Sequence, residues 1–165
     1  MRLSKHVEES LYVILLLATQ KGHRPIKSKR LSEILHVSDS SLKKVLRELV
    51  VKGLIHSSAS KDGGFELMKS IEDITLLDLV EAVEGEELIR YVPNNVAETI
   101  FSKKDHAKKS EQYIIDGLNQ ARDAYAAVLE KIKLAKILEE KTIQFGAIEW
   151  SLSDEERRNL HNEIN

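Results

Sequence analysis

The segment from Ser38 to Gly53 constrains the fold of this chain more than any other. Its apolar residues recur at helical intervals, and its polar residues repeat the same interval with an offset. Because an α-helix turns once every ~3.6 residues, the two sets lie on opposite faces of one helix. The apolar set is Leu42, Val45, Leu46, Leu49 and Val50, and the polar set is Ser40, Lys43, Lys44 and Arg47. We predict a helix that begins after Ser38 as N-cap, runs to about Lys52 and has Gly53 as its left-handed C-terminal cap.

Two shorter patterns precede this helix. Apolar residues at helical spacing predict a first helix over 4–20, which ends before Gly22. Ser28 is a typical N-cap for a short second helix over 29–35, and His36 with Val37 breaks that pattern. If the apolar face of the third helix packs on these two, its three cations and one hydroxyl face outward.

A predicted β-hairpin follows the third helix. The runs 54–58 and 65–68 are strand-like, and the turn-rich segment 59–64 separates them. Thr75 and Asp78 have the spacing of a weak capping box for a further helix that Gly85 ends. Three helices and a hairpin, with the third helix basic on its outer face, form the arrangement of a winged helix-turn-helix domain over 1–85. The predicted fold class is therefore mainly α with a small β-hairpin wing.

The C-terminal half is predicted to contain one long helix over 109–141. Its apolar residues alternate in steps of four and three, which is typical of a coiled-coil seam and favours a homodimer. A helix that only packs on its own domain would show nearly the same spacing over this length. Residues 86–108 would be a linker and the place to look for a small-molecule effector, and no function is assigned to the tail 142–165. The predicted dimer seam is Ile114, Leu118, Ala121, Tyr125, Val128, Ile132 and Ala135.

The formal net charge of -2 hides two halves of opposite sign. Residues 1–70 hold 13 Lys/Arg against 7 Asp/Glu, whereas residues 71–165 hold 12 against 20. Such asymmetry suggests that the first half meets a polyanion, with chance clustering of solvated charges as the alternative. The charge pattern is therefore compatible with nucleic-acid binding.

Several classes of protein are excluded by what the sequence lacks. It has no cysteine, so it can form no disulfide, thiolate–zinc site or cysteine-ligated iron–sulfur cluster within the chain. Its six histidines are scattered without metal-ligand spacing, and we expect no metal site. It contains no phosphate loop, nucleophile elbow, zincin helix or dinucleotide fingerprint, so we expect no enzyme. No signal peptide and no bilayer-length apolar run are present, and we expect a cytoplasmic protein with no membrane partner.

Several segments also resemble a known family. They are Met1–Ser4, Leu31–Ser38, the spaced residues from Leu42 to Ile55, Gly63–Leu67 and, most distinctively, Ile74–Gly85. Over residues 1–85 the chain resembles the Rrf-two-type regulators, the family of the iron–sulfur cluster regulator, the nitrite-sensitive repressor and the cysteine-metabolism repressor. The resemblance implies a bacterial, homodimeric transcription regulator, usually a repressor, that binds double-stranded DNA at a pseudo-palindromic operator. The long helix occupies the family's dimerisation position.

Candidate DNA-binding residues follow from the resemblance and from the helix pattern together. The family's recognition helix uses the positions of Ser38, Ser40, Ser41, Lys43 and Lys44, and Arg2 and Ser4 match positions that approach backbone phosphate. The exposed stripe adds Arg47. The wing adds Lys61, Gly63 and Gly64, although the two glycines serve the hairpin turn first.

Two departures from the family pattern bear on function. The cluster-binding members have three cysteines before the dimer helix, and this chain has none, so we expect a regulator without an iron–sulfur cluster. The wing carries Ala59 and Ser60 where the family usually has an Arg-Gly pair, and the Lys61 ammonium is a poorer planar donor than a guanidinium. The alternative is a winged-helix module that binds a protein or a ligand and has little affinity for DNA.

Overall fold

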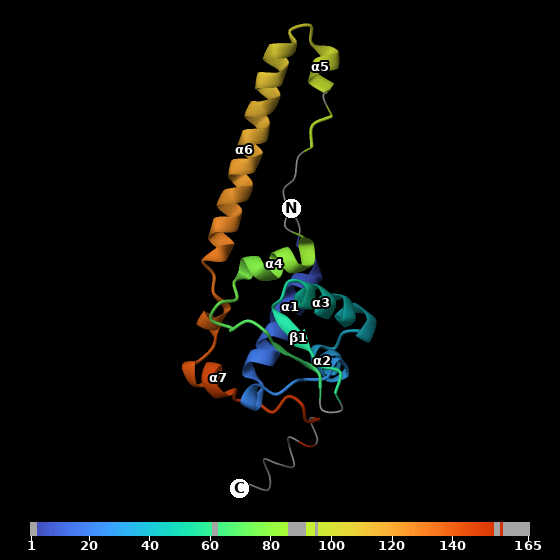
Figure 1. Ribbon diagram of the computed structural model, residues 1–165, viewed down its shortest axis with the longest axis vertical. Helices are drawn as coiled ribbons and strands as arrows, with labels where there is room; N and C mark the ends of the chain where they lie inside the picture. Colours follow the sequence, from blue (N-terminus) through green and yellow to red (C-terminus); the bar gives the residue numbers. More distant parts are fainter. Residues whose placement is uncertain (1–2, 61–62, 86–91, 95, 154–155, 157–165) are drawn as a thin grey trace.

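The structure, a computed structural model, describes residues 3–60, 63–85, 92–94, 96–153 and 156. Short helices and a hairpin gather around α1, and one long helix, α6, extends away from them (Figure 1). The elements in chain order are α1 (Lys5–Thr19), the 3₁₀ turn η1 (Lys21–His23), α2 (Ser28–Leu35), α3 (Asp39–Val51), β1 (Ile55–Ser57), β2 (Phe65–Leu67), α4 (Leu76–Glu84), α5 (Val96–Ile100), α6 (Lys104–Glu130), the 3₁₀ turn η2 (Leu134–Ile137) and α7 (Glu140–Phe145). The predicted fold class is confirmed.

The core lies between α1, α2, α3, α4 and the base of the hairpin. The apolar face of each of these elements is buried, because apolar side chains at helical spacing point to one side. Burying them removes their surface from water, which is the main force that holds the domain together. The fully buried large side chains of this core are Ile14, Ile26, Leu31, Leu42, Leu46, Leu49, Leu54, Ile55, Ile74 and Leu79.

The turn between α2 and α3 is tight. His36 has a left-handed backbone (φ 53°), and its N–H donates to the carbonyl oxygen of Glu33 at 3.3 Å. The predicted break at His36 is thus confirmed. The prediction that Ser28 caps α2 is wrong: Ser28 is the first helical residue, and Lys27 is the N-cap, without a side-chain cap bond. The Lys27 carbonyl accepts the N–H of Leu31 at 3.0 Å and so starts the helix.

The hairpin pairs β1 with β2 in antiparallel register, with Ile55 opposite Leu67 and Ser57 opposite Phe65. The segment before α2 adds a third line of pairing, because Ile26 and Phe65 donate their N–H groups to each other's carbonyl oxygens at 2.9 Å. The wing is therefore attached at its base to the chain that leads into the helix-turn-helix. This attachment fixes the direction in which the wing leaves the core.

The long helix differs from its prediction at both ends. It begins at Lys104 and ends at Glu130, so one continuous helix over 109–141 is wrong. After Glu130 the chain pairs with the start of α4: the Leu76 N–H donates to the Ile132 carbonyl at 2.9 Å, and the Leu134 N–H donates to the Ile74 carbonyl at 3.0 Å. Because partners far away in the sequence satisfy these backbone groups, the helix stops although its apolar periodicity continues.

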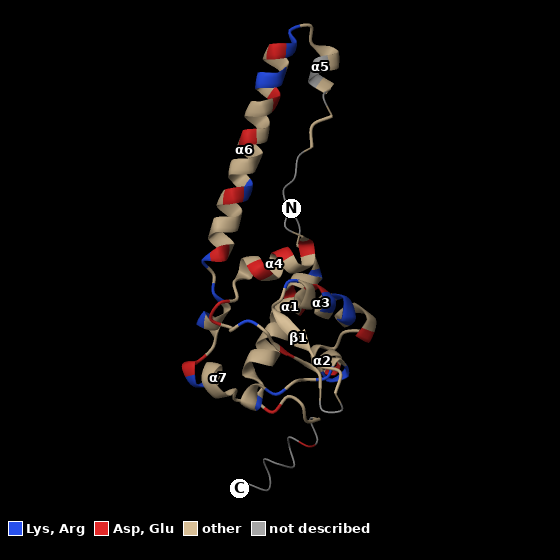
Figure 2. Ribbon diagram, in the orientation of Figure 1, with Lys and Arg blue, Asp and Glu red and all other residues tan. Residues whose placement is uncertain are grey.

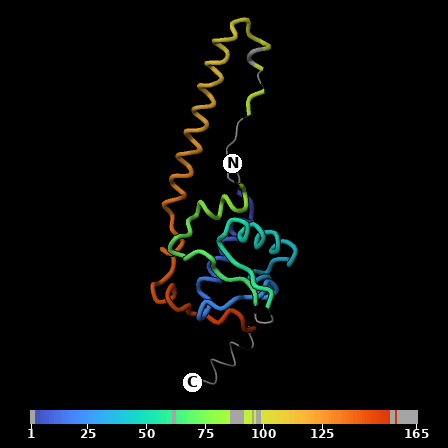
Figure 3. Tube along the Cα trace, in the orientation of Figure 1, coloured from blue at the N-terminus to red at the C-terminus, as the bar shows by residue number. Residues whose placement is uncertain are grey.

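The chain after α7 returns to the first helix. In Figure 3 the C-terminal residues, coloured red, run beside the blue end of α1. The N–H groups of Ala147 and Ile148 donate to the Thr19 carbonyl at 2.9 and 3.0 Å. Among the described residues, no helix is both long enough and apolar enough to cross a membrane.

Candidate nucleic-acid interface

Helix α3 divides sharply into a buried and an exposed face. Leu42, Val45, Leu46 and Leu49 are at most 1% exposed, whereas the polar stripe predicted on the other side is exposed. Figure 2 shows several cationic segments on α3, in contrast to the acidic segments of α4. The residues of the exposed stripe are Ser40, Lys43, Lys44 and Arg47. A helix anchored in this way presents its cations on a rigid element.

The N-terminus of α3 is capped as predicted. The Ser38 Oγ accepts the N–H of Ser41 at 3.2 Å and lies 3.2 Å from the Ser40 Oγ. Both Ser38 and Ser40 are exposed. A helix N-terminus with hydroxyl groups is favourable for an anion, because its first N–H groups and the helix dipole both attract negative charge.

The acidic residue Asp39, next to the predicted site, is not among the residues predicted from the sequence. The Asp39 carboxylate forms an ion pair with the Lys43 Nζ at 2.6 Å, and both side chains are half or more exposed. The spacing of four residues on a helix is the signal that could have revealed this pair. Such a pair contributes little to stability, but it lowers the positive charge of the stripe.

Ser41 and Ser4 lie differently from the stripe. Ser41 is half-buried, and its hydroxyl donates to the buried Glu9 carboxylate at 3.4 Å, so it faces α1. Ser4 is exposed, and its N–H donates to Glu84 Oε1 at 2.7 Å. Hydrogen bonds from Ser4 lower the pKa of the Glu84 carboxyl, which places an anion beside this predicted phosphate contact. Arg2 lies outside the described residues.

The wing glycines have a packing role. A Cβ on Gly64 would lie 2.6 Å from the Ile26 carbonyl, and one on Gly63 would overlap the backbone of Ser58. The Ser58 N–H donates to the Gly64 carbonyl at 2.9 Å, which closes the wing. Both glycines are therefore needed for the turn itself, and Lys61 lies outside the described residues.

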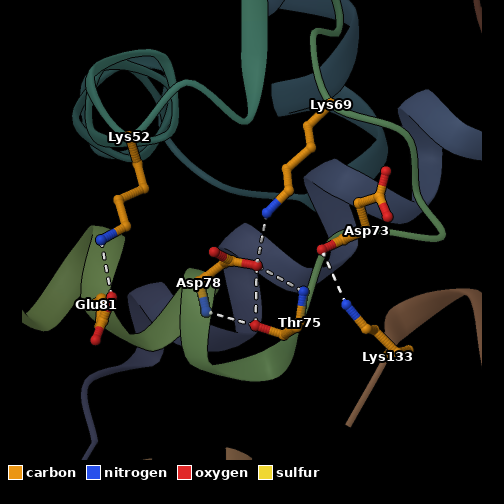
Figure 4. Close-up of polar contacts among 7 residues, drawn as sticks. All are labelled: Lys52, Lys69, Asp73, Thr75, Asp78, Glu81 and Lys133. Atoms are coloured by element: carbon orange, nitrogen blue, oxygen red, sulfur yellow. Dashed lines mark hydrogen bonds and ion pairs between the residues drawn. The ribbon is translucent and has the colours of Figure 1, made fainter. Parts of the chain in front are cut away.

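Polar contacts on α4 support the back of α3 (Figure 4). Lys52, at the C-terminal cap of α3, donates to Glu81 at 2.8 Å. Thr75 and Asp78 form the predicted capping box. The Thr75 N–H donates to Asp78 Oδ2 at 2.8 Å, and the Asp78 N–H donates to Thr75 Oγ1 at 3.1 Å. Burial raises the pKa of Asp78, but hydrogen bonds from Thr75 and Lys69 outweigh it, so that the pKa lies below its ordinary value.

The same close-up links α4 to the chain after α6. The Lys133 Nζ donates to the Asp73 carbonyl at 3.4 Å, next to the pairing of Leu76 with Ile132. The end of α6, the start of α4 and the end of α3 are thus joined by a short series of polar contacts. Helix α4 also packs on both α3 and α6 and so connects the two helices.

The predicted dimer seam lies only partly on α6. Ile114, Leu118, Ala121, Tyr125 and Val128 are on the helix, and Ile114 and Val128 are 55% and 61% exposed. Ile132 and Ala135 lie beyond its end. Ala135 packs against the core of its own domain, as the alternative to a dimer seam expects for that residue.

Nothing in the described part of the chain forms a metal site. The structure contains there no group of three or more His, Cys, Asp or Glu side chains that could hold an ion. The sequence has no cysteine to supply a thiolate.

Comparisons with known proteins agree with this geometry. The model of the Rrf2 family, described as an iron-dependent transcriptional regulator, matches residues 3–140. YffB of Lactococcus lactis, which is named as an HTH-type transcriptional regulator, is 34% identical to this chain. The match covers 88% of this chain and 92% of YffB. The HTH-type transcriptional regulator NsrR of Shouchella clausii is 30% identical over 79% of this chain and 84% of its own.

Solved structures share the fold. CymR, the global cysteine regulator of Bacillus subtilis, aligns with a TM-score of 0.57 at 24% identity, over 83% of this chain and 95% of that one. IscR of T. potens aligns with a TM-score of 0.56 at 22% identity, over 86% and 88%. The family consists of transcriptional regulators and not of enzymes. This chain, with its basic helix α3 and its hairpin wing, belongs to the Rrf2 family of helix-turn-helix transcriptional regulators.

Proposed function

We propose that this protein is a sequence-specific regulator, a repressor, which binds a pseudo-palindromic operator as a homodimer in the bacterial cytoplasm. The observation that carries the proposal is the division of α3 into a buried apolar face and an exposed face with Lys43, Lys44 and Arg47. In a winged helix-turn-helix this third helix enters the major groove. Its cations contact phosphates, and its first turn reaches base edges.

The homodimer is supported by α6. This helix has 27 residues, and only Ala107 is buried among those that the structure describes. By the rise of an α-helix it is ~40 Å long. An isolated helix that exposes Tyr113, Ile114 and Val128 gains stability when a second copy covers them. Two copies joined in this way would place two α3 helices about one duplex turn, ~34 Å, apart.

We further propose that this regulator works without an iron–sulfur cluster. The family description refers to iron, but the residues here do not fit such a group, because the chain has no cysteine. A small-molecule effector would be sought between α5 and α6. A cavity of about 660 Å³ lies there, lined mainly by apolar side chains such as Val96, Ile100 and Phe101.

A second candidate is a winged-helix module that binds a protein or ligand and has little affinity for DNA. The Asp39–Lys43 ion pair and the wing residues Ala59 and Ser60 favour it, since they reduce the cationic and guanidinium contacts available to DNA. Salt dependence separates the two candidates. Each neutralised phosphate releases condensed counterions, so DNA affinity falls steeply with salt, whereas apolar association does not.

The test is fluorescence anisotropy with a duplex from the region upstream of the protein's own coding sequence and a scrambled duplex, from ~50 to 200 mM salt. We expect tight, sequence-selective and salt-steep binding. Replacing Lys43, Lys44 and Arg47 with alanine should weaken binding to both duplexes and flatten the salt dependence. A matched control replaces the exposed Lys131, Lys136 and Lys141. Equal, weak binding to both duplexes would favour the interaction module.

A further inference from the structure

The C-terminal strap, residues 146–151, is built into the helix-turn-helix. It pairs in parallel with the end of α1, where the Lys21 N–H donates to the Ile148 carbonyl at 2.8 Å. Gly146 (φ 66°) begins the strap, and a Cβ there would overlap the Gln20 carbonyl oxygen. The close approach therefore requires glycine at this position.

Side chains then fix the strap in place. Gln20 is fully buried. Its side-chain Oε1 accepts the backbone N–H of Trp150 at 2.8 Å, and its Nε2 donates to Glu149 Oε1 at 2.6 Å. The Trp150 indole N–H donates to the Thr19 Oγ1 at 2.8 Å. A buried amide with both ends bonded holds its partners firmly, since leaving it unpaired would be costly.

The fixed strap forms one wall of a cationic hollow. This hollow has a volume of about 560 Å³ and lies between the start of α2, the turn of the wing at Gly63 and the strap. Its lining residues are Arg24, Pro25, Lys27, Arg30, Gly63 and Ser151. Three of the six carry a positive charge, and the wing glycine places the hollow on the same domain edge as the wing.

The cations of the hollow are held by the surrounding residues to different degrees. Arg30 is largely buried, and its Nε donates to the Trp150 carbonyl at 2.9 Å. Its Nη1 donates to Glu33 Oε2 at 3.3 Å. Arg24 forms an ion pair with Glu149 and remains 63% exposed. Lys27 is exposed at the entrance to α2.

We propose that this hollow binds a phosphate group of the DNA backbone, as a contact additional to those of α3 and the wing tip. The inference rests on the proposed function. The exposed Lys27 ammonium supplies a point charge for phosphate, and the exposed Arg24 guanidinium adds planar donors. The strap has a positioning role, because Trp150 and Gln20 keep Arg30 and Glu149 in place.

Glu149 should affect DNA affinity in the direction opposite to that of the cations. Its carboxylate faces Arg24 and would repel an incoming phosphate. Burial raises the pKa of Glu149, but hydrogen bonds from Ser151 and Gln20 and the charge of Arg24 outweigh it, so the group is ionised at neutral pH. Removing this charge should strengthen DNA binding, whereas removing a cation should weaken it.

The experiment measures anisotropy with a ~30-base-pair duplex of random sequence, because phosphate contacts do not depend on sequence. Lys27→Gln should lower the slope of log K against log salt by about 1 for each protomer, and so by about 2 for the bound homodimer. Its loss of affinity is then about tenfold smaller at 200 mM than at 50 mM salt. Glu149→Gln keeps an acceptor for Gln20 and should raise affinity at 50 mM salt. Lys136→Gln, on η2, is the matched control and should leave the slope unchanged.

The outcomes separate this proposal from the proposed function. A wild-type slope for Lys27→Gln, together with a reduced slope for the triple alanine variant of α3, overturns the hollow alone. No salt-dependent binding by the wild type overturns both. If inorganic phosphate raises the melting temperature of the wild type but not of Lys27→Gln, while DNA slopes are equal, the hollow serves free phosphate instead. Equal melting temperatures of the variants without ligand confirm that folding is unaffected.

Discussion

The helix-turn-helix half and the α6 arm show the same sequence signal with opposite results. In α3 four of the five apolar residues at helical spacing are at most 1% exposed and Val50 is 37% exposed, but on α6 Ile114 and Val128 remain more than half exposed. The difference lies in the partner, because α3 packs on α1 and α4 whereas most of α6 extends beyond the domain (Figure 1). Apolar periodicity therefore indicates a face that needs covering and does not by itself say which chain covers it.

The largest expected effect is a difference in stability between a substitution on α3 and one on α6. Leu46→Ala should lower the free energy of unfolding by about 2–5 kcal/mol, because it leaves a cavity in the core between α1 and α3. Ile114→Ala should change the unfolding of a monomer very little, since its side chain is already 55% exposed. Denaturant unfolding at low protein concentration checks the pair. Equal losses for both would mean that α6 is part of the monomer core.

The next effect concerns the dimer. Val128→Asp would place a charge in the proposed seam and should weaken association by about 2–3 kcal/mol, roughly a hundredfold in the dimer Kd. Ala127→Asp, at the exposed neighbouring position, is the control and should leave association nearly unchanged. Sedimentation equilibrium measures both. If the two variants dissociate equally, the seam does not lie on this face.

The capping box of α4 gives a smaller effect. Thr75→Ala removes the hydroxyl that accepts the Asp78 N–H and should cost about 1 kcal/mol of stability. Thr75→Ser retains the hydroxyl and should restore most of it. Thermal unfolding of the three proteins is the measurement, and a Thr75→Ala protein as stable as the wild type would contradict the role of the cap.

The pH dependence of stability follows from Asp78. Its pKa is lowered in the folded protein, so folding favours the ionised form; this stabilisation is complete above the ordinary value near ~3.9 and is lost as the pH falls below it. Thermal unfolding between pH ~5 and ~3 should therefore show a steeper loss of stability for the wild type than for Asp78→Asn. Asp116→Asn on α6 is the control. Parallel curves for the wild type and Asp78→Asn would rule out this linkage.

The local parts of the fold could be predicted from the sequence. The caps at Ser38 and Thr75 and the left-handed Gly53 (φ 73°) depend on residues within a few positions, and the structure confirms them. The end of α6 could not be predicted, because Ile132 continues the apolar pattern while its carbonyl pairs with Leu76. A backbone pairing with a segment more than fifty residues away leaves no periodic signal.

The candidate site divides in the same way. The exposed stripe of α3 was predicted because one helix face specifies it. Contacts between distant segments determine the rest of the site. They turn Ser41 toward Glu9, place the Glu84 carboxylate beside Ser4 and hold the strap on Gln20. The tail that carried no functional prediction, and in particular Trp150, is the element that completes the hollow beside the wing.

The most direct test of the account is a hydroxyl-radical footprint on the upstream duplex. A homodimer that reads DNA with two α3 helices should protect two segments whose centres lie about one helical turn apart, ~10 base pairs. The variant with Lys43, Lys44 and Arg47 replaced by alanine should lose both segments while retaining its melting temperature. Protection that persists in this variant, or a single protected segment, would contradict the claim that paired α3 helices hold the DNA.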